Sequence, residues 1–162
     1  MSGSERLNTT SDNNTYANNT YAQSIDIVTT PIAGVSVPAV QSIGVDIADI
    51  KRLRALCERW QASVMSRLFT DQEQSCCQSI SGYRWSSLAG RFSAKEAVKK
   101  ILASHGESAG WTEIEILNGP HGEPYIQLYG RAQDALARIG YKHLMLSISH
   151  EANLAIATVI AS

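Results

Sequence analysis

Hydrophobic positions recur at helical spacing over one long stretch in the middle of the chain, which predicts a helix from about residue 83 to 104. One stripe of this helix combines apolar residues with a single carboxylate: Trp85, Ala89, Phe92, Glu96 and Ala103. Further apolar residues lie on its other sides: Leu88, Val98, Ile101 and Leu102. We therefore expect this helix to be buried on more than one face.

Glu96 stands out because it shares a stripe with apolar residues. A carboxylate in such surroundings loses hydration and needs a partner, a metal ion or a proton. Lys100 follows one helical turn later, and Lys99 lies on the other flank of the same face. Spacing alone leaves two interpretations open: a surface ion pair at i,i+4, or a catalytic carboxylate.

Alternating apolar positions predict a short strand over residues 42–47, in which Asp46 points away from Ile43, Val45 and Ile47. A helix follows from about residue 49 to 61, and both Asp46 and Asp49 are candidates to cap it. That helix carries a run of cations, Lys51, Arg52, Arg54 and Arg59. The run predicts either a solvated face or a docking face for an acidic protein.

Shorter patterns fill the rest of the chain. Residues 65–69 predict an apolar helical or turn segment, and Thr70 with Glu73 fits a capping box that opens a short helix to about residue 79. After the central helix, apolar alternation and turn residues predict four strands and one helix: strands 111–117, 124–129, 144–149 and 154–160, and helix 132–139, which Gly140 ends. A turn at residues 150–153, which includes His150, joins the last two strands. The fold class is α+β, an antiparallel sheet with a long buried central helix.

The first part of the chain has a different composition. Residues 1–24 are rich in Ser, Thr and Asn and hold almost no aliphatic side chains, so they cannot bury enough surface to offset the entropy of ordering. Residues 25–40 are more apolar, but Pro31, Gly34 and Pro38 interrupt them. We therefore predict that residues 1–40 form a disordered or extended N-terminal extension and that residues 41–162 form the folded domain.

Composition limits the classes of partner. The chain has 162 residues, enough for one domain with a core, and its formal charge of −1 disfavours nucleic acid as the main partner. It has no apolar run of the roughly 20 residues that span a bilayer and no secretory signal, so we expect no membrane contact. The three cysteines, Cys57, Cys76 and Cys77, form no Cys-x-x-Cys motif. They predict a reduced, cytoplasmic protein without structural zinc.

Four motifs in order resemble the holo-acyl-carrier-protein synthase family of 4'-phosphopantetheinyl transferases. They are Gly44-Val45-Asp46-Ile47 with Ile50-Lys51-Arg52-Leu53, Ala89-Gly90-Arg91-Phe92-Ser93-Ala94-Lys95-Glu96-Ala97 with Lys100, Gly122-Glu123-Pro124-Tyr125, and Ser147-Ile148-Ser149-His150 with Ala155-Ile156-Ala157. Each motif alone is a weak signal, whereas the ordered set is specific. The resemblance begins at Gln41 and extends to the C-terminus, and it implies the 4'-phosphopantetheinyl transferase fold for this part of the chain.

The resemblance implies a reaction. Such enzymes transfer the phosphopantetheine arm of coenzyme A to a serine of an apo acyl carrier protein and release adenosine 3',5'-bisphosphate. Asp46 and Glu96 match the family's Mg²⁺ ligands, and Mg²⁺ suits a place where carboxylates meet a pyrophosphate. Glu96, or a metal-bound water held by it, is the candidate base for the serine hydroxyl. Lys100 would offset charge on the attacked phosphate or the leaving group.

Further residues are assigned by the same resemblance. Lys95 and His150 match positions near coenzyme A. Arg52 matches a position on the helix that docks the carrier protein, with Arg54 as a plausible helper. The short members of the family are typically trimers with sites at subunit boundaries, so a homotrimer is expected.

Two competing hypotheses come from other classes of protein. The first is a non-catalytic carrier-protein-binding module, which would need none of Asp46, Glu96 and Lys100. The second is a small nucleic-acid-binding domain that uses the helix at residues 51–59. The near-neutral charge of the chain disfavours the second hypothesis.

Overall fold

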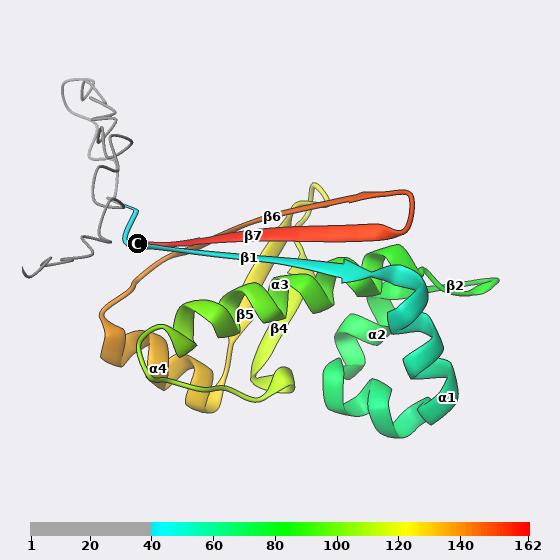
Figure 1. Cartoon of the computed structure of the whole chain (residues 1–162), viewed down its shortest axis with the longest axis horizontal. Helices are drawn as coiled ribbons and strands as arrows, with labels where there is room; N and C mark the ends of the chain where they lie inside the picture. Colours follow the sequence, from blue (N-terminus) through cyan, green and yellow to red (C-terminus); the bar gives the residue numbers. More distant parts are fainter. Residues whose placement is uncertain (1–39) are drawn as a thin grey trace, which may run out of the picture. The chain divides into compact units, whose positions relative to one another are not determined.

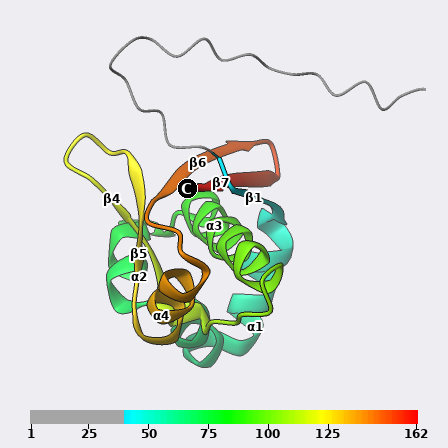
Figure 2. The same ribbon diagram turned by 90° about the vertical axis from the view of Figure 1, so that its left-hand side faces the viewer.

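Helix α3 (Trp85–Ala103) is the centre of the fold in the computed structural model, which describes residues 40–162 without the side chains of residues 61 and 62. Figure 1 shows α3 lying along a three-stranded sheet, and Figure 2, viewed from the end, shows the other elements around the remaining sides of the helix. This arrangement confirms the predicted α+β class and the buried central helix. The prediction for residues 1–39 lies outside the described residues.

The three-stranded sheet contains β1 (Ser42–Asp49), β7 (Leu154–Ala161) and β6 (Leu144–Glu151), in the order β1-β7-β6. Both pairs of neighbours are antiparallel, as predicted. Small residues line the sheet face that packs on α3, including Ala48, Ala155 and Ala157, all of them buried. Because these side chains are short, the helix can lie close to the sheet.

Two glycines set the distance between α3 and the sheet. A Cβ atom at Gly44 of β1 would lie 2.8 Å from the carbonyl carbon of Ala97 and closer still to its oxygen. A Cβ atom at Gly90 of α3 would lie 2.7 Å from Cγ2 of Ile148 on β6. Since real side-chain contacts are longer than this, any other residue would push the strand and the helix apart.

Helix α1 (Ile50–Leu68) is longer than predicted. It continues through the segment at residues 65–69 that we expected to be separate, because Met65 and Leu68 extend the buried stripe begun by Leu53 and Cys57. The capping box at Thr70 is confirmed, and it opens α2 (Asp71–Cys77). A hairpin of two-residue strands, β2 (Gln78–Ser79) and β3 (Gly82–Tyr83), was not predicted because such short strands have no periodicity.

The second half of the chain largely follows the prediction. Strands β4 (Ile114–Asn118) and β5 (Pro124–Leu128) form the expected hairpin, and α4 (Gly130–Ile139) ends at Gly140 in the left-handed region. Strand β4 begins later than predicted because a 3₁₀ turn, η1 (Trp111–Glu113), precedes it. Within residues 40–162, no helix has the length and apolar character needed to cross a membrane.

The position of His150 corrects one prediction. His150 and Glu151 belong to β6, and the turn consists of Ala152 and Asn153 alone. Ala152 has a φ of 51°, which suits the tight connection between two antiparallel strands. His150 is therefore held at a fixed register opposite Ala155 and does not lie at the tip of the turn.

The substitution Gly44→Ala tests the close contact between β1 and α3. We expect it to lower the free energy of unfolding by about 1–3 kcal/mol, as overpacking does, because the new methyl group meets backbone atoms that cannot move aside. Urea unfolding measures this. Gly110→Ala is the control, because the nearest neighbours of its Cβ would be the ends of the Glu113 and Arg131 side chains, which can move aside. An equal loss in both variants would contradict the account.

Candidate active site

The contact between β1 and α3 brings two predicted site residues together. Nζ of Lys100 lies 2.9 Å from Oδ1 of Asp46 and donates a second hydrogen bond of 2.7 Å to the carbonyl of Val45. The Asp46 side chain is 15% exposed and that of Lys100 is 52% exposed. The carboxylate is thus sheltered, while the ammonium keeps access to solvent and to any ligand that arrives there.

Glu96 lies one turn before Lys100 on α3, and it is half-buried where we expected it to be buried among apolar residues. Its two oxygens differ: Oε1 is shielded from solvent and has no hydrogen-bond partner among the described residues. The nearest cation is Nζ of Lys99, at 3.4 Å from Oε1. A shielded carboxylate oxygen without a hydrogen bond is costly, and a ligand would relieve that cost.

The register of the sheet places Asp46 beside the turn of α3 that carries Glu96. Gly44 lies against Ala97, and Ala155, which pairs with Ala48, accepts a hydrogen bond from Ser93. Asp46 lies between these two contacts along β1, on the face turned toward α3. The alternation of β1 is therefore the reverse of a simple core pattern, since Ile43, Val45 and Ile47 face outward.

This pair of carboxylates fits a magnesium ion. Among residues 40–162 no cluster of three His, Cys, Asp or Glu side chains could hold a metal by itself. Mg²⁺ commonly takes only one or two carboxylates and completes its shell with phosphate oxygens and water. Oε1 of Glu96, which makes no hydrogen bond among the described residues, and the sheltered carboxylate of Asp46 supply the hard oxygen donors that this arrangement requires.

Lys95 is the side chain whose position differs most from expectation. It is fully buried, and its ammonium donates to Oε2 of Glu73 at 2.6 Å, to the carbonyl of Leu68 at 2.7 Å and to that of Trp111 at 2.9 Å. A lysine ammonium has three donors, and all three are used inside the protein. The geometry favours a structural task for Lys95 over the predicted contact with coenzyme A.

Glu73 is equally buried, and it also accepts backbone hydrogen bonds from Thr70 and Ile116. Burial raises the pKa of Glu73 and lowers the pKa of Lys95, and the attraction between the two groups opposes both shifts. Every contact of the Glu73 carboxylate is with an N–H donor, which is the arrangement of an ionised group. The sequence showed Glu73 as part of a capping box but gave no sign of its burial.

His150 lies on the same side of the sheet as Asp46. It pairs with Ala155, which pairs in turn with Ala48, and residues 46 and 48 share one face of β1. The His150 side chain is exposed near the end of β6, which is an edge strand of the sheet. It is therefore free to contact a ligand near the start of α3, and its predicted contact with coenzyme A stays a prediction.

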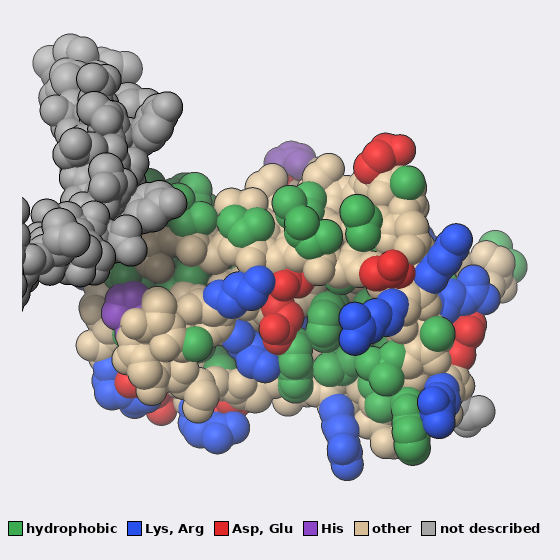
Figure 3. All heavy atoms as spheres, viewed as in Figure 1, with side chains coloured by type: hydrophobic (Ala, Val, Ile, Leu, Met, Phe, Trp, Pro, Cys, Tyr) green, Lys and Arg blue, Asp and Glu red, His purple; other side chains and the backbone are tan. Residues whose placement is uncertain are grey.

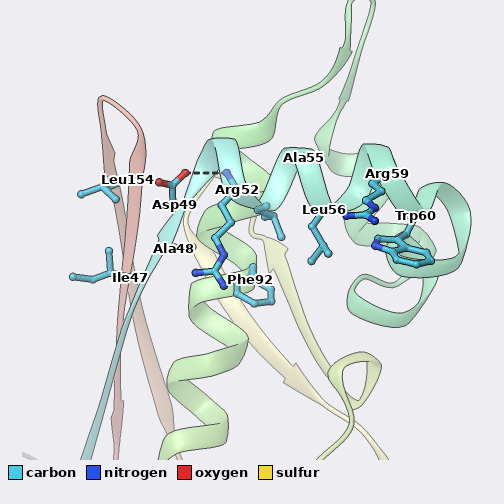
Figure 4. Close-up of a pocket in the computed structure, with 11 residues that line it drawn as sticks. Ile47, Ala48, Asp49, Arg52, Ala55, Leu56, Arg59, Trp60, Phe92 and Leu154 are labelled. Atoms are coloured by element: carbon cyan, nitrogen blue, oxygen red, sulfur yellow. Dashed lines mark hydrogen bonds between the residues drawn. The ribbon is translucent and has the colours of Figure 1, made fainter.

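A groove of about 730 Å³ opens along α1, next to Phe92 of α3 (Figure 4). It is lined by Arg52 and Arg59 of α1, by Phe92 of α3 and by apolar side chains that include Leu56 and Trp60. Phe92 is one turn before Glu96, so the groove leads toward the site. Arg59 was noted only as part of the basic run. It lies about two helical turns beyond Arg52, and this spacing of seven residues puts both arginines on one face of α1.

Arg54 does not line this groove. It pairs with Glu58 at 2.8 Å and lies 6.0 Å from the ring centre of Trp85, so its charge is already partly balanced. Asp49, at the edge of the groove, is the N-cap of α1, and Asp46 is not. The Asp49 carboxylate accepts a 2.9 Å hydrogen bond from the backbone N–H of Arg52. That bond, together with one from Asn153, lowers the pKa of Asp49.

Taken together, the fold and the site define a small α+β protein with a carboxylate pair and a lysine on a strand–helix contact, beside a basic groove. The sequence matches the profile of the 4'-phosphopantetheinyl transferase superfamily over residues 42–159. The chain belongs to this superfamily.

Individual relatives agree with this assignment. The holo-[acyl-carrier-protein] synthase of Dehalococcoides mccartyi strain CBDB1 is 46% identical over 118 residues, which are 73% of this chain and 95% of that protein. The synthase of Desulforudis audaxviator strain MP104C is 40% identical over 122 residues, 75% of this chain and 92% of that protein. Among solved structures, the Helicobacter pylori synthase in complex with coenzyme A is similar with a TM-score of 0.64, at 30% identity over 75% of this chain and all of that one.

Removing Lys95 tests how much the buried Lys95–Glu73 ion pair contributes to the stability of the fold. We expect Lys95→Met to lower the free energy of unfolding by about 3–5 kcal/mol, because it leaves the Glu73 carboxylate buried without a cation. The double variant Lys95→Met/Glu73→Leu should recover part of the lost free energy of unfolding, because it leaves no unpaired charge in the interior. A double-mutant cycle of urea unfolding measures the coupling, and additive losses would contradict it.

Proposed function

We propose that this chain is a holo-[acyl-carrier-protein] synthase. It transfers the 4'-phosphopantetheine moiety of coenzyme A to a serine of an apo acyl carrier protein and releases adenosine 3',5'-bisphosphate. The observation that carries the proposal is the placement of Asp46, Glu96 and Lys100 on one strand–helix contact in a chain of this superfamily. Relatives bear the same name, and two of the similar solved structures are complexes with coenzyme A.

Three side chains divide the work of the transfer. Asp46 and Glu96 would hold Mg²⁺, which when bound supplies positive charge at the pyrophosphate oxygens. Glu96 accepts the proton of the serine hydroxyl, whose oxygen attacks the phosphorus next to the pantetheine arm. The bond from that phosphorus to the bridging oxygen breaks, and the bisphosphate leaves. Lys100 offsets the charge on the phosphates, since its ammonium is held by Asp46 and Val45 with one donor to spare.

The groove on α1 is the proposed docking site of the carrier protein. Arg52 and Arg59 present two cations on one face of the helix, with apolar side chains between them. An acidic helix would match the cations, and its apolar side chains would match Leu56 and Trp60. The groove would also bring the carrier's serine toward Glu96, because Phe92 forms its inner wall.

We further propose a homotrimer with sites at the subunit boundaries. The outer face of the three-stranded sheet is apolar and exposed: Ile43, Val45, Ile47, Met145, Leu154 and Ile156. Figure 3 shows hydrophobic side chains in a band over this sheet. A second copy of the chain would cover such a face, and His150 at the edge would then lie where a neighbour can share the coenzyme A pocket.

We also propose that the protein works in the cytoplasm. Its three cysteines are free thiols, which is typical of a reducing compartment.

Intact-mass analysis of an apo acyl carrier protein tests the transfer. The carrier is incubated with the chain, coenzyme A and Mg²⁺, and a parallel sample contains EDTA. We expect a mass gain of one phosphopantetheine that EDTA abolishes. A folded chain that leaves the mass of several carriers unchanged would favour the non-catalytic binding module.

The substitution Glu96→Gln tests the carboxylate assignment. It removes a negative metal ligand and the proposed base while keeping the shape of the side chain, so turnover should fall by about 10²–10⁴-fold with the fold intact. Turnover is measured by the mass assay and folding by circular dichroism. Glu107→Gln, which lies in the loop after α3 and contacts Arg138, is the control and should keep normal turnover. Normal turnover in Glu96→Gln would refute the assignment.

The arginines of α1 can be compared one by one. We expect Arg52→Glu and Arg59→Glu each to raise the KM for the carrier protein about tenfold or more with little change in kcat, because each reverses a charge in the groove. Arg54→Glu should change the KM much less, since this arginine is outside the groove and paired with Glu58. Equal effects at all three positions would contradict the proposed docking face.

The N-terminal extension can be tested by truncation. A chain that begins at residue 25 keeps every proposed site residue, so we expect it to retain the turnover and KM of the full chain. Steady-state kinetics with carrier protein and coenzyme A measure both. A large loss of turnover would show that the extension takes part in the reaction.

A further inference from the structure

Lys99 has a position that the proposed reaction does not use. Its ammonium lies 3.4 Å from Oε1 of Glu96 and 3.5 Å from the ring centre of Trp111. Both contacts are close, and the side chain is only 28% exposed. A cation over the face of an indole is attracted by the ring's quadrupole. The ammonium of Lys99 therefore has two favourable partners at once, the Glu96 carboxylate and the Trp111 ring.

The aromatic partner of Lys99 is itself firmly held. Trp111 stacks on Phe92, with ring centres 5.1 Å apart and an angle of 16° between the planes. The carbonyl of Trp111 also accepts a hydrogen bond from the buried ammonium of Lys95. Since both the ring and its backbone are fixed, Trp111 gives Lys99 a preformed place of contact beside Glu96.

Asp46 and Glu96 each have one lysine as their nearest cation, but the two contacts differ. Asp46 has Lys100 at 2.9 Å, in a direct hydrogen bond. Glu96 has Lys99 at 3.4 Å, and its shielded Oε1 makes no hydrogen bond among the described residues. Each carboxylate is thus matched by one lysine, but the match at Glu96 is looser and leaves the oxygen available.

We propose that Lys99 is the counter-ion of Glu96 and competes with the divalent cation for its carboxylate. The inference rests on the proposed metal site. Two cations next to one carboxylate repel each other, so an ion bound by Glu96 displaces the ammonium of Lys99. The face of Trp111 keeps that ammonium partnered when it leaves Glu96. Lys99 thereby weakens divalent-cation binding, and it acts through Glu96 without touching the substrate.

Manganese binding tests this inference without relying on turnover. Mn²⁺ is titrated into the full chain, with and without coenzyme A, and free Mn²⁺ is measured by electron paramagnetic resonance. The variant Lys99→Met removes the charge and keeps an apolar stem against Trp111. We expect it to lower the Kd for Mn²⁺ about threefold or more, because the repulsion is gone. Lys99→Arg retains the charge and should keep the wild-type Kd.

One further control variant and two contrary outcomes make the experiment decisive. Lys142→Met removes an exposed lysine outside the site and should leave the Kd unchanged, which separates the local effect from that of total charge. An unchanged or higher Kd in Lys99→Met, with normal binding by the wild type, would overturn the competition alone. Absence of Mn²⁺ binding by the wild type, both with and without coenzyme A, would overturn the metal site and the competition together. The transfer assay would still report separately on the reaction.

Discussion

The buried ion pair between Lys95 and Glu73 is the constraint on which the rest of the site depends. One ammonium ties α3 to the end of α1, to the capping box of α2 and to η1, because its three donors reach Leu68, Glu73 and Trp111. These are the elements that carry the groove, the aromatic ring beside Glu96 and the carboxylate itself. Because unpaired buried charges are costly, the pair allows few alternative arrangements of these elements.

A second constraint works on the opposite side of α3. Gly44 and the alanines of β1 and β7 let the sheet lie directly on the helix backbone, and Asp46 reaches Lys100 as a result. The same close contact turns the larger side chains of β1 outward, which produces the exposed apolar face proposed to join the subunits. Site geometry and assembly thus follow from one feature, a sheet with its small residues facing inward.

Four neighbouring ionisable residues of α3 show how far sequence can lead. Glu96 and Lys100 were predicted because the motif and the helical spacing both mark them. Lys95 could not be placed, since its partner Glu73 is 22 positions away and burial between them leaves no local pattern. The proximity of Lys99 to Trp111 also depends on tertiary packing. Likewise, the predicted helix over residues 49–61 already contained Arg59, but the groove that Arg59 lines depends on Phe92 of α3, whose place beside α1 only the structure shows.

The most direct test of the central claim measures both products in one reaction. Apo carrier protein, coenzyme A, Mg²⁺ and the full chain are mixed, and holo-carrier and adenosine 3',5'-bisphosphate are quantified over time. The account predicts that one bisphosphate appears for each carrier modified, with neither formed on a carrier whose acceptor serine is replaced by alanine. Stable binding of the carrier with no release of bisphosphate would contradict it and identify the chain as a binding module.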